Sequence, residues 1–145
     1  MTTIVGDKTR LVADSRFTMF SRNGDSIITS PKLCRKRDAI IGTCGHADAA
    51  DAFIRWYGSK KKSPKFKTDE FEALVLTPKG LFHYDENCSG GLVLTPWCAI
   101  GTGGHAAYGA LYMGATLEMA VSIACKVDIY TGEPIQTMNL ETTEC

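Results

Sequence analysis

The chain has 145 residues, 44% of them hydrophobic, and its sixteen basic and sixteen acidic side chains give a formal net charge of zero at pH 7. This length predicts a single domain over residues 1–145, and the balanced charge excludes a global attraction to nucleic acid or to an anionic membrane. No apolar run approaches the roughly 20 residues that cross a bilayer, and no signal segment opens the chain, so we expect a cytoplasmic protein without a membrane partner.

The first third of the chain predicts short strands. Residues 2–5 and 9–14 are apolar, β-branched runs joined by a tight connection, which is typical of a β-hairpin. An Asn-Gly turn signal precedes a further strand at residues 26–29. Residues 35–38 have the composition of a polar turn. The continuous apolar run at residues 39–45 indicates a central strand that is buried on both faces.

The middle third begins with a helix. The alanines and aromatic residues at 47–57 are spaced to face one layer, which predicts about three helical turns. Residues 59–67 carry five lysines around a proline, the composition of an exposed loop. Residues 71–76 and 81–84 flank a turn with Pro and Gly and predict a second hairpin.

The last third predicts a strand, two helices and a final strand. The strand covers residues 97–101, and the first helix covers residues 105–113. Thr116 caps the second helix, whose apolar stripe runs from Leu117 to Val127. The last strand covers residues 133–140. Two sheets packed face to face, with helices covering the outside, would bury every apolar face in this order, so we expect an α+β fold.

The cysteine and histidine pattern gives no metal signature. The six cysteines are scattered without a Cys-x-x-Cys pair, which is typical of reduced thiols. Cys44 and His46 are two positions apart, but the sequence holds no second pair of this kind. We therefore expect no metal site and no cofactor. Nothing in the sequence pairs His46 or His105 with a nucleophile, so we expect these histidines in the core or at the rim of a site.

The first residues offer a nucleophile. Removal of Met1 would leave Thr2 with both a hydroxyl and a free α-amine. An α-amine has a pKa of roughly 7.7–8.0, so near neutral pH it can take the proton of the hydroxyl. Met-Thr-Thr alone is far more often an ordinary start followed by a strand, so the interpretation depends on the motifs that accompany it.

Five short stretches follow the order found in one family. They are Met-Thr-Thr-Ile-Val at the start, Asp14-Ser15-Arg16, Gly42-Thr43-Cys44-Gly45, Ile100-Gly101-Thr102-Gly103-Gly104, and Asp128-Ile129-Tyr130-Thr131-Gly132. With these motifs the chain resembles the proteasome β-type subunits and, most closely, the bacterial HslV peptidase, which are threonine peptidases among the N-terminal nucleophile hydrolases. The resemblance covers nearly the whole length and implies a four-layer αββα sandwich.

The resemblance implies roles for three residues near the start. Thr2 matches the nucleophile, and Asp14 and Lys32 match the acidic and basic pair beside it. A lysine cation near Thr2 would disfavour a second positive charge on the amine and so lower the pKa of that amine. The aspartate would keep the lysine charged and fixed in position.

Four further positions complete the catalytic centre that the resemblance implies. Thr102 takes the place of a family serine near the amine, where a hydroxyl can relay a proton. Asp128 and Thr131 match polar groups that orient the amine of the nucleophile. The backbone N–H of Gly45 is our choice for the oxyanion donor.

The resemblance also implies a substrate pocket and partners. Thr43 and Cys44 match the wall of the pocket for the residue before the scissile bond. Substrates would be peptides or unfolded proteins, cleaved inside a homo-oligomeric ring with an ATP-driven AAA+ unfoldase as a partner.

Between Tyr57 and Phe71 the chain departs from the family pattern. The family adds a second long helix there, whereas this chain has only the lysine-rich loop, so one helical layer is expected to be short. An alternative function is a catalytically silent structural or assembly subunit of a larger particle such as a virus, located in the host cytoplasm or the virion. A nucleic-acid-binding module on the lysine-rich loop is a third alternative, but Phe66 is the one aromatic residue there that could stack on bases.

Overall fold

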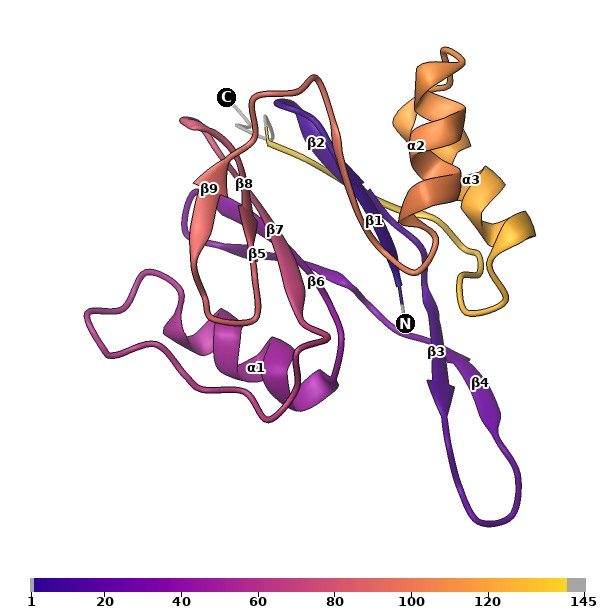
Figure 1. Ribbon diagram of the computed structural model, residues 1–145, viewed down its shortest axis with the longest axis horizontal. Helices are drawn as coiled ribbons and strands as arrows, with labels where there is room; N and C mark the ends of the chain where they lie inside the picture. The colour runs from indigo at the N-terminus through magenta and orange to yellow at the C-terminus, as the bar shows by residue number, and fades with distance from the viewer. Residues whose placement is uncertain (1, 141–145) are drawn as a thin grey trace.

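The computed structural model describes residues 2–140, so that Met1 and residues 141–145 lie outside it (Figure 1). Within this range the chain forms eleven strands and three helices. The strands are β1 (Thr3–Gly6), β2 (Arg10–Ala13), β3 (Arg16–Met19), β4 (Ser26–Thr29), β5 (Leu33–Lys36), β6 (Ala39–Cys44), β7 (Glu72–Thr77), β8 (Gly80–Tyr84), β9 (Gly90–Leu92), β10 (Cys98–Gly101) and β11 (Gln136–Asn139). The helices are α1 (Ala47–Trp56), α2 (Gly104–Tyr112) and α3 (Leu117–Val127).

The strands form two larger sheets and one separate hairpin. One sheet has four strands in the order β10-β1-β2-β11, and the other has five in the order β5-β6-β7-β8-β9. The hairpin pairs β3 with β4. All of these pairings are antiparallel. The predicted α+β class is therefore confirmed, with antiparallel strand pairing throughout the described sheets.

Neighbouring residues on the interior strands β1 and β6 face different apolar clusters. Ile4 and Val5 are both fully buried, but Ile4 packs with Leu74 between the two sheets, whereas Val5 packs beneath α2 and α3. On β6, Ile40 faces the space between the sheets and Ile41 faces Phe53 of α1. Side chains alternate across a strand, so strands covered on both faces must be apolar throughout.

The helices therefore lie on the outer faces of the two sheets. Figure 1 shows α1 against the five-stranded sheet and the α2–α3 pair against the four-stranded sheet. The Thr116 hydroxyl accepts a hydrogen bond from the Met119 N–H at the start of α3, as expected for an N-cap. None of the helices within residues 2–140 is long and apolar enough to cross a membrane.

Some details differ from the sequence-based expectation. The polar turn predicted at residues 35–38 begins later, because β5 continues through Lys36 and Arg37 takes a positive φ of 57°. Strands β3, β5 and β9 were not predicted. Val127 was expected on the buried stripe of α3, but it is 68% exposed, and the last buried residue of the helix is Ala124.

Candidate active site

A buried carboxylate connects the start of the chain to three other segments. Asp14 is completely buried. Its Oδ1 accepts hydrogen bonds from the Thr3 N–H at 3.0 Å and from Lys32 Nζ at 2.8 Å. Its Oδ2 accepts from the backbone N–H groups of Gly132 at 3.0 Å and Arg16 at 3.1 Å. Four donors compensate for the loss of water around the charge, so Asp14 holds these four segments together.

Lys32 is the cation of this group. Its side chain is 6% exposed, and its backbone N–H donates to Oε1 of Gln136 at 3.0 Å. Burial lowers the pKa of Lys32, although the ion pair with Asp14 acts in the opposite direction. The ammonium of Lys32 therefore gives up its proton more readily than that of an exposed lysine.

A second polar group follows α3. Asp128 Oδ2 accepts hydrogen bonds from the hydroxyls of Thr102 and Thr131, the latter at 2.6 Å. Its Oδ1 accepts from the Tyr130 N–H at 3.1 Å. Burial alone would raise the pKa of Asp128, but these three hydrogen bonds outweigh it and hold that pKa below its ordinary value. Asp128 is therefore ionised at neutral pH.

Thr3 joins the two polar groups. Its N–H donates to Asp14, and its hydroxyl lies 2.8 Å from the hydroxyl of Thr131. The single hydrogen of the Thr131 hydroxyl goes to Asp128, so Thr3 is the donor in the bond between the two threonines. The residue directly after Thr2 thus connects the Asp14 ion pair with the Asp128 network.

Thr2 has a different environment from Thr3. Thr2 is 6% exposed and lines a cavity of about 520 Å³. Within residues 2–140 no hydrogen-bond partner exists for its hydroxyl, whereas every fully enclosed side-chain nitrogen or oxygen in that range has one. The Thr2 hydroxyl is therefore not fully enclosed, and it reaches the cavity.

Backbone contacts fix the position of Thr2. Gly101 has a φ of 91°, and a Cβ atom at this position would lie 1.7 Å from the Thr2 carbonyl oxygen. Only glycine allows β10 to approach Thr2 this closely. The strand β1 lies between β10 and β2, so both neighbours hold the segment that leads to Thr2.

The cavity beside Thr2 contains predicted and unpredicted residues. Of the predicted site residues, Thr2, Cys44, Gly45 and Thr102 line it, whereas Thr43 is not among the described residues that do. Four acidic side chains of the wall were not predicted from the sequence, namely Asp69, Glu70, Glu72 and Glu86, and His105 also lines the cavity. The acidic pair Asp69-Glu70 just before β7 was a signal for part of this wall, because it follows the lysine-rich loop directly.

Cys44 and Gly45 shape the cavity in different ways. Burial raises the pKa of the Cys44 thiol to about 12, so the thiolate required for nucleophilic attack does not form at neutral pH. Gly45 has a φ of 117°, and a Cβ atom there would lie 2.4 Å from the Glu70 carbonyl oxygen. A side chain at Gly45 would therefore displace the acidic segment of the wall.

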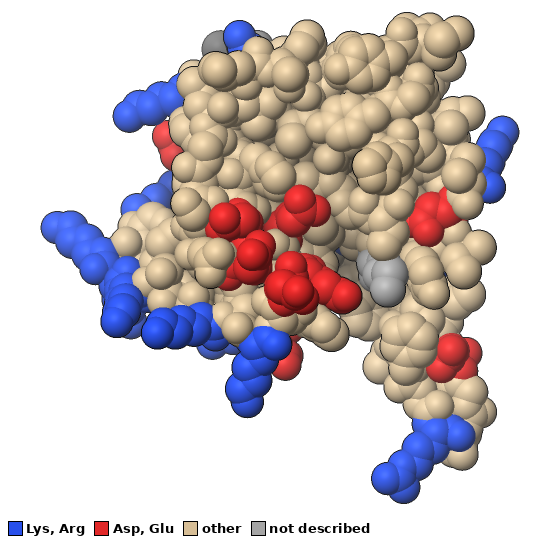
Figure 2. All heavy atoms as spheres, in the orientation of Figure 1, with Lys and Arg blue, Asp and Glu red and all other residues tan. Residues whose placement is uncertain are grey.

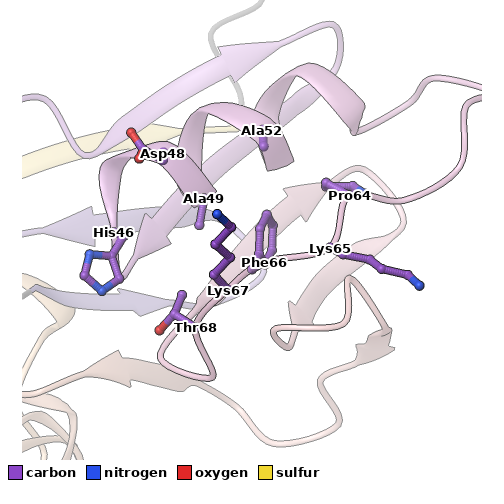
Figure 3. Close-up of a pocket in the computed structure, with 9 residues that line it drawn as sticks. All are labelled: His46, Asp48, Ala49, Ala52, Pro64, Lys65, Phe66, Lys67 and Thr68. Carbon is purple, nitrogen blue, oxygen red and sulfur yellow. The ribbon is translucent and has the colours of Figure 1, made fainter.

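A second hollow of about 460 Å³ lies where the lysine-rich loop passes the N-terminus of α1 (Figure 3). His46 and Asp48 line one side, and Phe66 and Lys67 line the other. Phe66 packs against Phe71 with ring centroids 4.7 Å apart. This hollow holds no predicted catalytic residue, and His46 lies at its rim.

No set of three or more His, Cys, Asp or Glu side chains within residues 2–140 is arranged to hold a metal ion. The five cysteines in this range are all free thiols.

No protein-family model and no curated protein sequence matches the chain. Among solved structures, eukaryotic HslV from Trypanosoma brucei matches with a TM-score of 0.68 and 18% identity, covering 94% of this chain and 98% of that chain. BPH from Thiobacillus denitrificans in complex with epoxomicin matches with a TM-score of 0.65 and 17% identity, covering 97% of this chain and 98% of that chain. The Anbu (Gly-1) mutant from Hyphomicrobium sp. strain MC1 matches with a TM-score of 0.66 and 12% identity, covering 96% of this chain and 81% of that chain.

At these identities the likeness establishes the fold. The resemblance to HslV and proteasome-like proteins that the sequence motifs indicated is therefore confirmed for the fold.

Proposed function

We propose that the protein is a threonine endopeptidase whose nucleophile is Thr2, once the chain before Thr2 is removed. The observation that carries this proposal is the contrast between the two threonines. The Thr2 hydroxyl reaches a cavity, while the neighbouring Thr3 is bonded into both polar groups. This leaves one hydroxyl available for a substrate and holds its backbone in place.

The chemistry follows from a free amine and a hydroxyl on one residue. Thr2 Oγ1 attacks the carbonyl carbon of the peptide, and its proton passes to the α-amine of Thr2, directly or through a water molecule. The Gly45 N–H stabilises the oxyanion that forms. The peptide C–N bond then breaks, and the leaving amine takes the proton from the Thr2 ammonium. Water hydrolyses the remaining ester and restores the Thr2 hydroxyl.

The surrounding groups act as positioning residues in this proposal. The partly desolvated Lys32 cation disfavours protonation of the nearby amine, and Asp14 fixes the lysine. Asp128 accepts from Thr102 and Thr131, so these three residues form one polar network at the cavity and beside Thr3. Cys44 contributes to the pocket wall for substrate. Thr43 is proposed to contact the same substrate residue from the neighbouring position on β6.

We propose the family's assembly for the chain as well. The packing of α1, the two sheets and the α2–α3 pair supports a four-layer αββα sandwich with a shortened α1 layer. We propose a homo-oligomeric ring in the cytoplasm that receives peptides or unfolded proteins, with an AAA+ unfoldase as its partner.

Covalent labelling tests the proposed function. BPH from Thiobacillus denitrificans has been solved in complex with epoxomicin, and we expect epoxomicin to add one equivalent to Thr2 of a chain that begins at Thr2. Thr2→Ala should abolish the adduct and lower peptide hydrolysis by at least about 10³-fold. Thr3→Ser keeps the hydroxyl of the neighbouring residue and should still be labelled.

Intact-mass spectrometry after purification would show which residue begins the chain. A chain that begins at Thr2, is folded, and neither takes up epoxomicin nor cleaves peptides would contradict the proposal.

A silent assembly subunit is the second candidate. Large apolar side chains are exposed on the β3–β4 hairpin and on α2 and α3, which favours contacts with other chains. Retention of the residue before Thr2 in the protein from its native source would support this function over the peptidase.

A further inference from the structure

We propose that the cavity beside Thr2 selects substrates with a Lys or Arg side chain next to the scissile bond. This inference rests on the proposed peptidase function and adds its substrate class. It follows from the charge of the cavity wall, from the hydrogen-bond acceptor capacity that one carboxylate in that wall retains, and from the position of the Thr2 hydroxyl.

The wall of the cavity is acidic. Four carboxylates line it, from Asp69, Glu70, Glu72 and Glu86, and none of the described lining residues is Lys or Arg. Within residues 2–140 no cationic side chain forms an ion pair with Asp69, Glu70 or Glu86. In Figure 2 acidic side chains gather in the middle of the visible face, while Lys and Arg lie towards its edges. A concave surface with one sign of charge attracts the opposite charge.

Glu72 is the carboxylate best placed to bind a cation. A hydrogen bond from His83, 3.1 Å from Glu72 Oε1, lowers the pKa of Glu72, while burial opposes the shift. Glu72 is therefore ionised at neutral pH. Gly101 donates a backbone hydrogen bond to this carboxylate, and Oε2 also has the Cys44 thiol at 3.9 Å, a weak donor. A carboxylate can accept about four hydrogen bonds, so Glu72 retains a lone pair that a guanidinium or ammonium group could use.

A long side chain fits these carboxylates better than a metal ion does. The four carboxylates do not converge, since no set of three or more His, Cys, Asp or Glu side chains within residues 2–140 is arranged to hold a metal. A Lys or Arg side chain instead presents one charge at the end of a flexible stem. The cavity of about 520 Å³ has room for that stem, and Gly45 adds no side chain to its wall.

The position of Thr2 relates this charge to the cleavage site. Thr2 is more than nine-tenths buried, has no hydrogen-bond partner within residues 2–140 for its hydroxyl, and lines the same cavity as the four carboxylates. A substrate whose carbonyl carbon meets the Thr2 hydroxyl would therefore place an adjacent side chain among these charges.

Peptide vinyl sulfones that differ only in the residue next to the warhead test the inference. With the chain that begins at Thr2, we expect the Arg probe to label Thr2 about 30-fold faster than the Leu probe, and the Glu probe to be slowest. The ratio should fall as salt rises from 50 mM to 500 mM, because the cavity is open to solvent. Glu72→Gln and Glu86→Gln should each lower the Arg/Leu ratio about fivefold. Asp51→Asn, an exposed change on α1 outside the cavity, should leave the ratio unchanged.

The outcomes separate the two proposals. Equal or faster labelling of Thr2 by the Leu probe would overturn the basic preference and leave the peptidase function standing. An Arg/Leu ratio that stays the same in both Gln variants would also overturn the assignment to this wall. Absence of labelling by every probe, in a folded chain that begins at Thr2, would overturn the peptidase function and the inference with it.

Discussion

At the scale of single residues, the site depends on threonine hydroxyls whose hydrogen bonds each have a fixed donor and acceptor. Asp128 receives the hydrogens of Thr102 and Thr131, which forces Thr3 to donate to Thr131. Gly103 allows this arrangement, because a Cβ atom there would lie 2.0 Å from the Thr3 hydroxyl oxygen. One ionised carboxylate therefore sets the direction of the hydrogen bonds beside Thr2.

The lowered pKa of Asp128 predicts a pH-dependent stability. As the pH falls, the unfolded chain takes up a proton at the ordinary value of 3.8 before the folded chain does. The stabilisation by ionised Asp128 is therefore complete above that value and is lost as the pH falls through the lower pKa of the folded state. We expect Asp128→Asn to lower the free energy of unfolding by about 1 kcal/mol at pH 7, after allowance for solvent screening.

Urea unfolding at pH 7 and at pH 3 would check this. The difference between Asp128→Asn and the parent should be smaller at pH 3 than at pH 7, whereas the exposed variant Asp51→Asn should change little at either pH. An equal loss at both pH values would show that the charge of Asp128 does not stabilise the fold.

The sequence predicted some site residues and missed others for a physical reason. Asp14 and Lys32 were proposed from the family motifs, and they form an ion pair at 2.8 Å. Glu72 and Glu86 were missed, because they come from two separate segments and meet only through the packing of β7 and β8. Hydrophobic periodicity indicates which residues are buried, but it does not indicate which polar residues share a cavity.

At the scale of elements, burial decided which strands the sequence could predict. β6 and β7 are interior strands covered on both faces, and their continuous apolar runs were recognised. β5 and β9 are the two edges of the same sheet, and they carry polar residues and glycines. An edge strand needs less apolar surface, so its composition resembles that of a turn.

The cap of α3 gives a second testable prediction. The Thr116 hydroxyl accepts from the Met119 N–H at 3.2 Å, so Thr116→Ala leaves a helix donor without this partner. We expect a loss of about 1 kcal/mol in the free energy of unfolding. Chemical denaturation would measure it, with Thr116→Asn as a variant that keeps a capping oxygen and should recover most of the loss. A similar loss in both variants would argue against capping.

At the scale of the whole molecule, apolar side chains remain exposed in two places. Figure 1 shows the β3–β4 hairpin projecting away from the two sheets. Phe20 and Ile27 of this hairpin are 72% and 64% exposed. On the α2–α3 side, Met113 and Ile129 are also largely exposed. Exposed apolar patches of this kind mark surfaces that contact other proteins.

The proposed ring predicts that the hairpin contributes to self-association. Ile27→Asp should lower the native mass of the assembly measured by light scattering, because a charge would have to be desolvated in the contact. Its neighbour Ser26 is also exposed on β4 but faces the other side of the strand, so Ser26→Asp is the matched control. An unchanged mass for Ile27→Asp would remove the hairpin from the interface.

The position of β1 has a practical consequence for producing the protein. The strand runs from the cavity at Thr2 towards its turn with β2, and the Leu140 N–H donates to the Thr9 carbonyl beside that turn. An affinity tag fused ahead of Thr2 would therefore be attached beside the cavity and would block the α-amine of Thr2. Leu140, the last described residue, lies at the opposite end of the sheet, so a tag at the C-terminal end is the better choice for purification.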